Sequence, residues 1–317
     1  MKPLVLVIAG PTASGKTEVG ILCASALGGE IISADSRQVY RGFDIGSAKP
    51  SPEWRAIVPH YFIDCADAEE SYTAGRFARE AAARILEIAA RGKRPIVVGG
   101  SGLYIRALMD GLFDDSVFDI KTERERLRVE LAARGAAVLY AELARCDPAA
   151  AASISPANVP RILRALEVCR ATGMPYSVVR QERMVEVPFE GWYCGIRWPR
   201  PELYARIERR VDEMFRRGLV EEVRALLERG TDPNARAFNG VGYREVAAYL
   251  HGSLTRDEAV RLVKQHSRNY AKRQMTWFAK DTRIRWYEAR NADDLPRIAS
   301  RIEEDYLAEE TRREASH

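Results

Sequence analysis

The first hundred residues alternate between short apolar runs and longer amphipathic stretches. Leu4–Ala9 is a continuous apolar run that ends at a glycine, a pattern typical of a buried parallel strand. Residues 15–27 then predict a helix, residues 30–34 a second strand and residues 95–98 a third. Residues 73–91 predict an amphipathic helix whose apolar positions recur at helical spacing: Phe77, Ala81, Ile85 and Ile88.

This order of strands and helices predicts an α/β fold, with a parallel sheet and helices on its faces. Ligands of such sheets gather at the carboxyl ends of the strands. All three predicted strands end in polar or glycine-rich sequence. We therefore expect the three ends to face one site.

The pattern changes after residue 113. Strand-like runs are absent from 114–190, where charged helical stretches dominate, among them 121–134 and 161–172. We interpret this part as a helical insertion that divides the core into residues 1–113 and 191–317. In the second core part the pattern predicts a strand at 192–198, helices over most of 201–280, an edge strand at 283–287, and a charged helix from Leu295 with a frayed end.

Composition narrows the class of protein only moderately. The 317 residues are 46% hydrophobic and 30% charged, which suits a soluble globular protein, and the net charge of +4 does not by itself indicate nucleic acid. The five cysteines are scattered and the four histidines lack zinc-ligand spacing. Reduced thiols and an N-terminal apolar run too short to span a bilayer lead us to expect a cytoplasmic protein.

The strongest chemical signal is GPTASGKT, which matches GxxxxGK[ST] between an apolar strand and a helix. Backbone N–H groups of such a loop bind phosphate, its lysine adds a positive charge, and its threonine can ligate Mg²⁺. The motif indicates a diphosphate or triphosphate and does not distinguish them. The alternative is a glycine-rich turn that matches by chance, which the correct flanking elements disfavour. The residues are Gly10, Pro11, Thr12, Ala13, Ser14, Gly15, Lys16 and Thr17.

Two weaker signals follow the other strands. In SADSRQVY, Asp35 could act as a general base, hold Mg²⁺ through water, or cap a turn, and spacing alone favours the cap. In VVGGSGLY, the glycines allow close backbone approach to a ligand and Ser101 offers a hydroxyl. Taken alone, that sequence more often marks a tight turn between a strand and a helix.

Basic and aromatic residues are interleaved in residues 264–290. This combination suits phosphate contacts and base stacking. Without the other motifs, we would favour a solvated amphipathic helix whose aromatic residues belong to the core. The basic residues are Lys264, Arg268, Lys272, Arg273, Lys280, Arg283, Arg285 and Arg290, and the aromatic ones are Tyr270, Trp277, Phe278 and Trp286.

Together, the motifs resemble the tRNA dimethylallyltransferase family. The resemblance rests on GPTASGKT, DSRQVY, FDIGSAKP and VGGSGLYIRAL in that order, followed by VPRILRALEV, NGVGYREV and AKRQMTWF, and it covers nearly the whole chain. It implies a P-loop NTPase-like core and a helical insertion that grips tRNA. We expect the protein to be a monomer. The implied reaction is Mg²⁺-dependent transfer from dimethylallyl diphosphate to N6 of the adenine just 3′ of the anticodon (position 37), in tRNAs that read codons beginning with U.

The resemblance also assigns roles to residues of this chain. Asp35 would take the N6 proton, Ser101 and Arg206 would contact the diphosphate or the reacting region, and Thr17 would ligate the metal. The family's P-loop holds the prenyl diphosphate. The implied tRNA contacts are Asp35, Ser36, Arg37, Gln38, Ser101, Arg124, Pro160, Arg161, Ile162, Leu163, Arg164, Asn239, Gly240, Val241, Gly242, Tyr243, Arg244, Lys272, Arg273, Gln274, Met275, Thr276, Trp277, Phe278 and Ala279.

The chain departs from the family pattern in a few places. Ser47 and Ser101 stand where threonine is usual, and 113–121 lacks the prolines expected before Arg124. No C-terminal zinc-finger pattern is present in the sequence, unlike the longer eukaryotic form. Three alternatives remain open: an isopentenyltransferase that uses AMP, a P-loop kinase or NTPase in which Asp35 holds Mg²⁺, and a non-enzymatic RNA-binding protein, which would leave the P-loop unexplained.

Overall fold

A computed structural model describes residues 2–111, 120–182 and 186–316, without the side chains of residues 120 and 121. The chain forms two compact units, a core unit of Met1–Met109 with Val187–His317 and a second unit of Asp110–Glu186. The predicted boundary at residues 113 and 114 lies outside the described residues. The second boundary falls at Glu186, whereas the sequence pattern suggested residue 190.

The core unit is built on a six-stranded sheet in the order β3-β2-β4-β1-β5-β6, with every pair parallel. The register pairs Ala9 with Gly99 and Ser33 with Val98, so the ends of β1, β4 and β2 meet at one edge, as predicted. The predicted strand at 283–287 is the edge strand β6. The strands are β1 (Leu4–Ala9), β2 (Gly29–Ser33), β3 (His60–Tyr61), β4 (Arg94–Gly99), β5 (Glu190–Arg197) and β6 (Arg285–Glu288).

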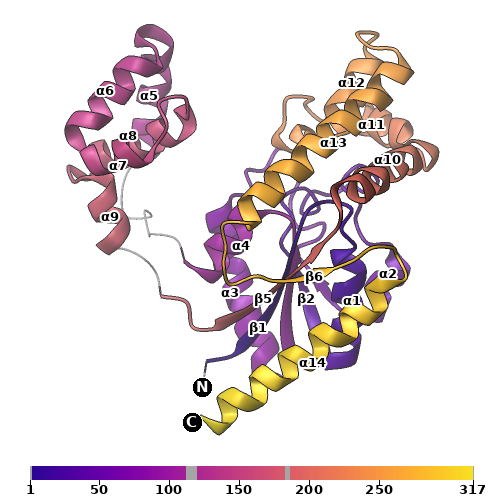
Figure 1. The fold of residues 1–317 in the computed structure, drawn as a ribbon. Helices are drawn as coiled ribbons and strands as arrows, with labels where there is room; N and C mark the ends of the chain where they lie inside the picture. Colours follow the sequence, from indigo (N-terminus) through magenta and orange to yellow (C-terminus); the bar gives the residue numbers. More distant parts are fainter. Residues whose placement is uncertain (1, 112–119, 183–185, 317) are drawn as a thin grey trace. The chain divides into compact units, whose positions relative to one another are not determined.

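Alternate strand residues enter two hydrophobic cores, one on each face of the sheet. Val5 and Val7 of β1 belong to the core under α3 (Ala74–Ala90) and α4 (Gly102–Met109). Leu6 and Ile8 belong to the core under α1 (Lys16–Leu27) and α14 (Asp294–Ala315), as Figure 1 shows. Both faces of the strands are buried, which explains their continuous apolar runs. The α/β prediction is confirmed.

Helices α10 to α13 lie beyond the carboxyl ends of the strands (Figure 1), and a short 3₁₀ helix, η1, lies between α11 and α12 in the chain. The longest is capped by Thr255, whose hydroxyl accepts a hydrogen bond from the Glu258 backbone N–H, while the Glu258 carboxylate accepts one from the Thr255 N–H. These elements are α10 (Arg200–Arg216), α11 (Leu219–Glu228), η1 (Arg236–Asn239), α12 (Tyr243–Leu250) and α13 (Arg256–Phe278).

The C-terminal helix α14 differs from the expectation of a frayed tail. It continues to Ala315 and packs along α1 through an apolar stripe that includes Ile298, Ile302 and Tyr306. Near its end, Glu310 forms an ion pair with Arg94 (2.9 Å). The charged residues of α14 lie on its outer side, and its buried side completes the core that it shares with α1.

The second unit is helical, with its own apolar core around Leu127, Leu139 and Leu166. Its helices are α5 (Ile120–Arg134), α6 (Ala136–Cys146), α7 (Pro148–Ser153), α8 (Val159–Thr172) and α9 (Tyr176–Glu182). The sequence pattern did not predict β3 or the short helix α2 (Pro52–Ile57) in the core unit, since neither carries a periodic apolar pattern. Within the described part of the chain, no helix combines the length and apolar character needed to cross a bilayer.

Candidate active site

The GPTASGKT loop connects the end of β1 to the start of α1. Gly15 precedes the helix at a φ of 87°, a conformation that side chains with a Cβ rarely adopt. A Cβ at Gly15 would also lie 2.6 Å from Leu295 Cδ1 of α14. Lys16 Nζ reaches back along the loop and donates to the Pro11 carbonyl (3.1 Å). The loop thus has the strand–loop–helix geometry of a phosphate-binding site.

A side chain that directly follows β5 and one from α10 hold one side of this loop. Trp198 Nε1 donates to the Ser14 carbonyl (2.9 Å), and Arg206 Nε donates to the Ala13 carbonyl (2.8 Å). The Arg206 guanidinium lies 4.2 Å from the centre of the Trp198 ring. Arg206 therefore lies at the P-loop, as expected, and part of its role is structural.

Gln274 of α13 holds the other side. Its Oε1 accepts from the Thr12 backbone N–H (2.8 Å), and its Nε2 donates to the Gly100 carbonyl (2.8 Å). One buried amide thereby joins the P-loop to the end of β4. Gln274 was expected at the RNA, whereas its side chain is used within the protein.

Arg210 is a site residue that sequence reasoning missed. It lies one helical turn after Arg206, so both project from the same side of α10, and its Nη1 donates to Thr12 Oγ1 (3.3 Å). Burial lowers the pKa of Lys16 to about 8, while Asp35 raises it and Arg210 lowers it further. Two cations and one carboxylate thus lie close together at the P-loop. The four-residue spacing of Arg206 and Arg210 could have revealed this second arginine.

Asp35 begins a tight turn directly after β2. Its Oδ1 accepts from the backbone N–H groups of Arg37 (2.8 Å) and Gln38 (3.4 Å), which is the capping role. No other described residue hydrogen-bonds to its second oxygen. One carboxylate oxygen therefore fixes the side chain, and the other remains available for chemistry.

Ser101 joins the turn after β2 to the turn after β4. Its Oγ accepts from the Ser36 backbone N–H (2.9 Å) and contacts Ser36 Oγ (3.2 Å). Ser101 N–H also donates to the Ala34 carbonyl (3.2 Å). Ser101 therefore uses its hydroxyl to position the segment that carries Asp35.

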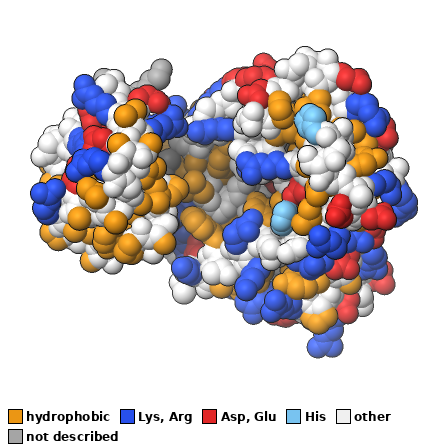
Figure 2. Space-filling model, turned by 90° about the horizontal axis from the view of Figure 1, so that it is seen from above, with side chains coloured by type: hydrophobic (Ala, Val, Ile, Leu, Met, Phe, Trp, Pro, Cys, Tyr) orange, Lys and Arg blue, Asp and Glu red, His pale blue; other side chains and the backbone are white. Residues whose placement is uncertain are grey.

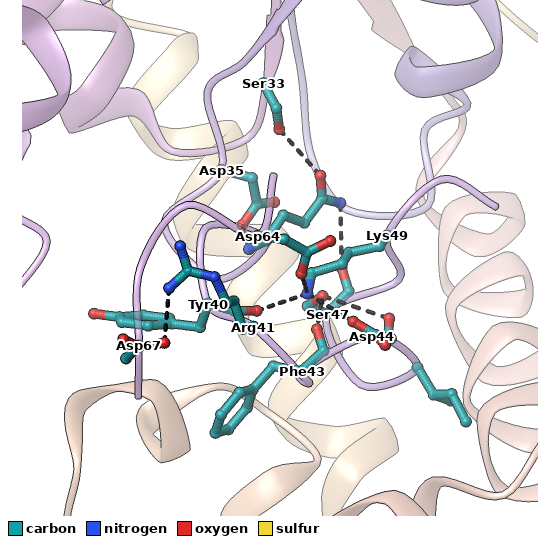
Figure 3. A network of polar contacts seen from close by, with 12 residues as sticks. Ser33, Asp35, Tyr40, Arg41, Phe43, Asp44, Ser47, Lys49, Asp64 and Asp67 are labelled. Atoms are coloured by element: carbon teal, nitrogen blue, oxygen red, sulfur yellow. Dashed lines mark hydrogen bonds and ion pairs between the residues drawn. The ribbon is translucent and has the colours of Figure 1, made fainter. Parts of the chain in front are cut away.

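The FDIGSAKP segment is held by polar contacts, several of them made by the buried Lys49 side chain (Figure 3). Lys49 Nζ donates to the Tyr40 carbonyl (2.6 Å), to Asp44 (2.7 Å) and to Asp64 (2.5 Å). On the other side, the Glu222 carboxylate of α11 accepts from three consecutive backbone N–H groups, 44 to 46. The segment is therefore rigidly attached beside Asp35.

Two of the cavities at this cluster reach the turn that carries Asp35. The first, of about 260 Å³, is lined by Lys16, Thr17, Asp35 and Arg210, and also by apolar side chains of α10 and α13 that include Val211 and Val263. The second, of about 650 Å³, is lined by turns after β2 and β4 and by Trp277 of α13. Both cavities include Ser36, Arg37, Asn239, Tyr270, Arg273 and Gln274 in their linings.

The structure brings together some of the expected RNA contacts and buries others. Lys272, Arg273 and Thr276 of α13 are exposed, as are Asn239 and Arg244. Among the expected contacts in the core unit, the buried ones are Gln38, Ser101, Gly240, Gly242, Tyr243, Gln274 and Phe278. Asp35, Ser36, Arg37, Val241, Met275 and Trp277 are half-buried, and Ala279 is exposed. The basic segment is also divided, because Lys264 pairs with Asp212 and Arg268 with Glu208.

Two of the expected contacts of the second unit, Arg124 and Arg164, share one buried carboxylate. Arg124 Nε and Arg164 Nη1 lie 2.9 Å and 3.2 Å from Glu167, which is almost fully buried. Pro160 and Arg161 are exposed at the start of α8, Leu163 is half-buried, and Ile162 belongs to the apolar core. The burial of Ile162 and the partial burial of Leu163 are explained by packing in this core.

Comparison with known proteins agrees with this geometry. Residues 38–281 match the family model described as IPP transferase. The chain is 48% identical over 303 residues to the tRNA dimethylallyltransferase of Geobacter sulfurreducens, covering 95% of this chain and 97% of that one. It is 45% identical to the enzyme of the same name from Pelotomaculum thermopropionicum, covering 95% and 96%.

Solved structures give the same result. The full-length tRNA isopentenylpyrophosphate transferase of Bacillus halodurans superposes with a TM-score of 0.70 at 36% identity, covering 99% of this chain and all of that one. A eukaryotic dimethylallyltransferase acting on tRNA superposes with a TM-score of 0.80 at 29% identity, covering 97% and 80%. The chain has a P-loop beside a fixed aspartate, and it matches these relatives over almost their whole length. It therefore belongs to the IPP transferase family.

Proposed function

We propose that this chain transfers the dimethylallyl group of dimethylallyl diphosphate to N6 of the adenine 3′ of the anticodon, position 37, in tRNAs that read codons beginning with U. The observation that carries the proposal is the first cavity, which joins the P-loop, Asp35 and an apolar wall in one space. A prenyl diphosphate has the same division, with a charged end and a short apolar end. The protein's relatives carry the corresponding name.

The positive charges at the P-loop indicate where the diphosphate of the donor binds. Lys16 and Arg210 place two cations at the P-loop, whose N–H groups also bind phosphate. The carbon chain then extends toward Val211, Met214 and Val263, which offer apolar contact. This orientation points the reactive carbon toward Asp35.

The acceptor end uses the second cavity. The target adenine must leave the stacked anticodon loop to reach the donor, and aromatic side chains compensate for the lost stacking. Trp277 and Tyr104 line this cavity, and Arg273 lies in the wall that it shares with the first. The adenine enters from this side, opposite the diphosphate.

In the proposed transfer reaction, Asp35 acts as the base. The N6 lone pair forms a bond to C1 of the dimethylallyl group while the C1–O bond breaks and its electrons leave with the diphosphate. The N6 proton passes to the free oxygen of Asp35, whose other oxygen is fixed by the Arg37 N–H. Lys16 and Arg210 stabilise the charge that develops on the leaving group.

Magnesium is part of the proposal. The described residues contain no group of three or more His, Cys, Asp or Glu side chains arranged to hold a metal. A P-loop site does not need one, because Mg²⁺ binds there mainly through substrate phosphates and water. Thr17 lines the first cavity with Asp35, so its hydroxyl would be the direct protein ligand. When bound, the ion neutralises diphosphate charge.

The second unit, Asp110–Glu186, is proposed to grip the tRNA stem-loop. Arg161 is exposed at the start of α8. Glu167 accepts hydrogen bonds from Arg124 (2.9 and 3.1 Å) and Arg164 (3.2 Å), which holds the two guanidinium groups beside one another in an arrangement suited to phosphate. We further propose a cytoplasmic monomer, in keeping with tRNA as the substrate.

One experiment tests the assignment. The protein is incubated with dimethylallyl diphosphate, Mg²⁺ and total tRNA lacking the modification, and the nucleosides are analysed by mass spectrometry. The proposal expects dimethylallyl-adenosine in the tRNA fraction. Parallel reactions contain AMP as acceptor, or ATP with assay of ADP. Product on AMP alone would identify the small-molecule enzyme, and ADP release without prenyl transfer would identify a kinase or NTPase.

A further inference from the structure

Tyr270 of α13 lines both of the cavities described above. In the proposed reaction the first cavity holds the donor and the second admits the adenine, so a side chain common to both lies beside the place of transfer. Lys and Arg side chains are frequent at this end of the core unit, beyond the carboxyl ends of the strands (Figure 2), and they favour the approach of RNA. Neither the sequence motifs nor the proposed reaction gives Tyr270 a role.

The hydroxyl of Tyr270 is hydrogen-bonded to Ser101 and lies near Asp35. Burial raises the pKa of Tyr270 to about 12, so the phenol is neutral at pH 7. Ser101 has one hydroxyl proton, which it donates to Ser36 Oγ (3.2 Å), while its oxygen accepts from the Ser36 N–H (2.9 Å). Tyr270 is therefore the donor in its contact with Ser101. The Tyr270 oxygen itself accepts no hydrogen bond from any other described residue.

The Tyr270 ring is also held in place before any substrate binds. The Arg273 guanidinium lies 5.7 Å from the centre of the ring. Gln274, the next residue on the same turn of α13, is fixed to the P-loop and to the end of β4 (2.8 Å each). The phenol oxygen thus keeps its place relative to Asp35, and little ordering is lost when a ligand uses it.

The amino group of adenine matches these two acceptors. It carries two protons in the plane of the base, whereas the prenylated product keeps only one. The free oxygen of Asp35 and the oxygen of Tyr270 provide one acceptor for each proton. With both protons bound, the amino group is held in one orientation, with a face of N6 toward the donor carbon. A purine with a carbonyl at this position would instead turn its lone pairs toward two acceptors.

We propose that Tyr270 binds the amino group of the target adenine and accepts the N6 proton that the product retains. During transfer the N6–C1 bond forms, the C1–O bond breaks, and the diphosphate leaves with the electron pair. One N6 proton moves to Asp35. The other stays on nitrogen, and its hydrogen bond to the Tyr270 oxygen keeps the base in the reacting position. The proposal rests on the proposed function and adds a residue that recognises the amino group.

The test compares two anticodon stem-loop RNAs that differ only at the target position, which is adenine in one and unsubstituted purine, without the amino group, in the other. Binding to the full-length protein is measured without donor. We expect the wild type to bind the adenine RNA more tightly. Tyr270→Phe should reduce this preference by about three- to tenfold, because one hydrogen bond is lost, and leave binding of the purine RNA unchanged. In transfer assays, kcat of this variant at saturating RNA should fall as well, because N6 is less well oriented.

Tyr249→Phe is the matched control, since this half-buried tyrosine of α12 lies outside the linings of both cavities. It should leave the preference and kcat unchanged. A Tyr270→Phe protein that keeps the wild-type preference for adenine over purine, or that binds both RNAs more weakly by the same factor, would overturn the proposal. Absence of transfer by the wild type to the adenine RNA would instead refute the proposed function, because the binding preference is measured without donor.

Discussion

Asp35 uses its two carboxylate oxygens differently. One accepts the Arg37 N–H and fixes the turn, and the other has no partner among the described residues. The sequence left a cap and a base as alternatives, but the geometry allows both roles at once. This division also makes a conservative substitution informative, because an asparagine can keep the capping bond while losing the ability to take a proton.

The first prediction concerns Asp35→Asn. The turn should survive, so unfolding temperature and affinity for RNA and donor stay near the wild-type values, while kcat falls about 10²–10⁴-fold. Single-turnover transfer with saturating tRNA, measured over a Mg²⁺ series, checks this. Asp67→Asn, at an exposed ion pair with Arg41, is the control. Rescue by excess Mg²⁺ would instead assign Asp35 to the metal.

The second prediction concerns the charge of Lys16. Burial lowers its pKa to about 8 in the free protein, so its positive charge is present below that pH and is lost as pH rises through it. We expect kcat/KM for the prenyl diphosphate to fall above about pH 8. The bound diphosphate favours the charged lysine, so kcat itself should fall only at a higher pH. Lys16→Arg should abolish the basic limb, and its persistence would contradict the assignment.

At the scale of elements, the FDIGSAKP segment shows why a motif residue need not touch the substrate. Tyr243 is buried, and its hydroxyl donates to Glu222 (2.8 Å) and accepts from the Ser47 N–H (3.2 Å). Glu222 in turn binds the backbone of residues 44 to 46. A loop and two helices are thus joined through one tyrosine that was expected to contact tRNA.

The third prediction tests whether Tyr243 stabilises the fold or contacts tRNA. Tyr243→Phe should lower the free energy of unfolding by about 1.5–3 kcal/mol, because a hydrogen bond to a charged group is lost in a buried place. RNA affinity at a temperature where the variant is fully folded should remain unchanged. Urea unfolding and stem-loop binding measure the two effects. A loss of affinity without a loss of stability would return Tyr243 to the RNA interface.

The elements that sequence patterns predicted best were those with strong periodicity. Phe77, Ala81, Ile85 and Ile88 are all fully buried on α3, as their spacing indicated. Roles inside the site were harder to predict, because they depend on contacts between distant segments. Gln274 reaches the P-loop across 262 positions, and neither its type nor its spacing distinguishes an internal amide from one that faces RNA.

At the scale of the whole molecule, the chain enters and leaves the second unit at neighbouring places in the core. A Cβ on Gly191 of β5 would lie 2.8 Å from Met109 Cε at the end of α4. The two units have separate apolar cores. The core unit therefore has the features of a fold that does not require the second unit.

The fourth prediction follows from this. A variant with residues 110–186 replaced by a short glycine-serine linker should fold cooperatively and bind prenyl diphosphate as the full chain does. Transfer to tRNA should be lost through weaker RNA binding, because the contacts of the second unit are missing. Calorimetry, donor binding and transfer assays measure these quantities. Wild-type transfer by the shortened chain would exclude a role of the second unit in gripping tRNA.

The bracing of the P-loop also has a consequence for synthesis on the ribosome. The motif is complete by residue 17, but Trp198, Arg206 and Gln274 hold its carbonyl and N–H groups, and Leu295 packs against its last glycine. The central strand β1 likewise gains its second neighbouring strand only when β5 has been synthesised. A nascent chain therefore lacks the residues that brace its phosphate-binding loop until the segment that carries Leu295 has been synthesised.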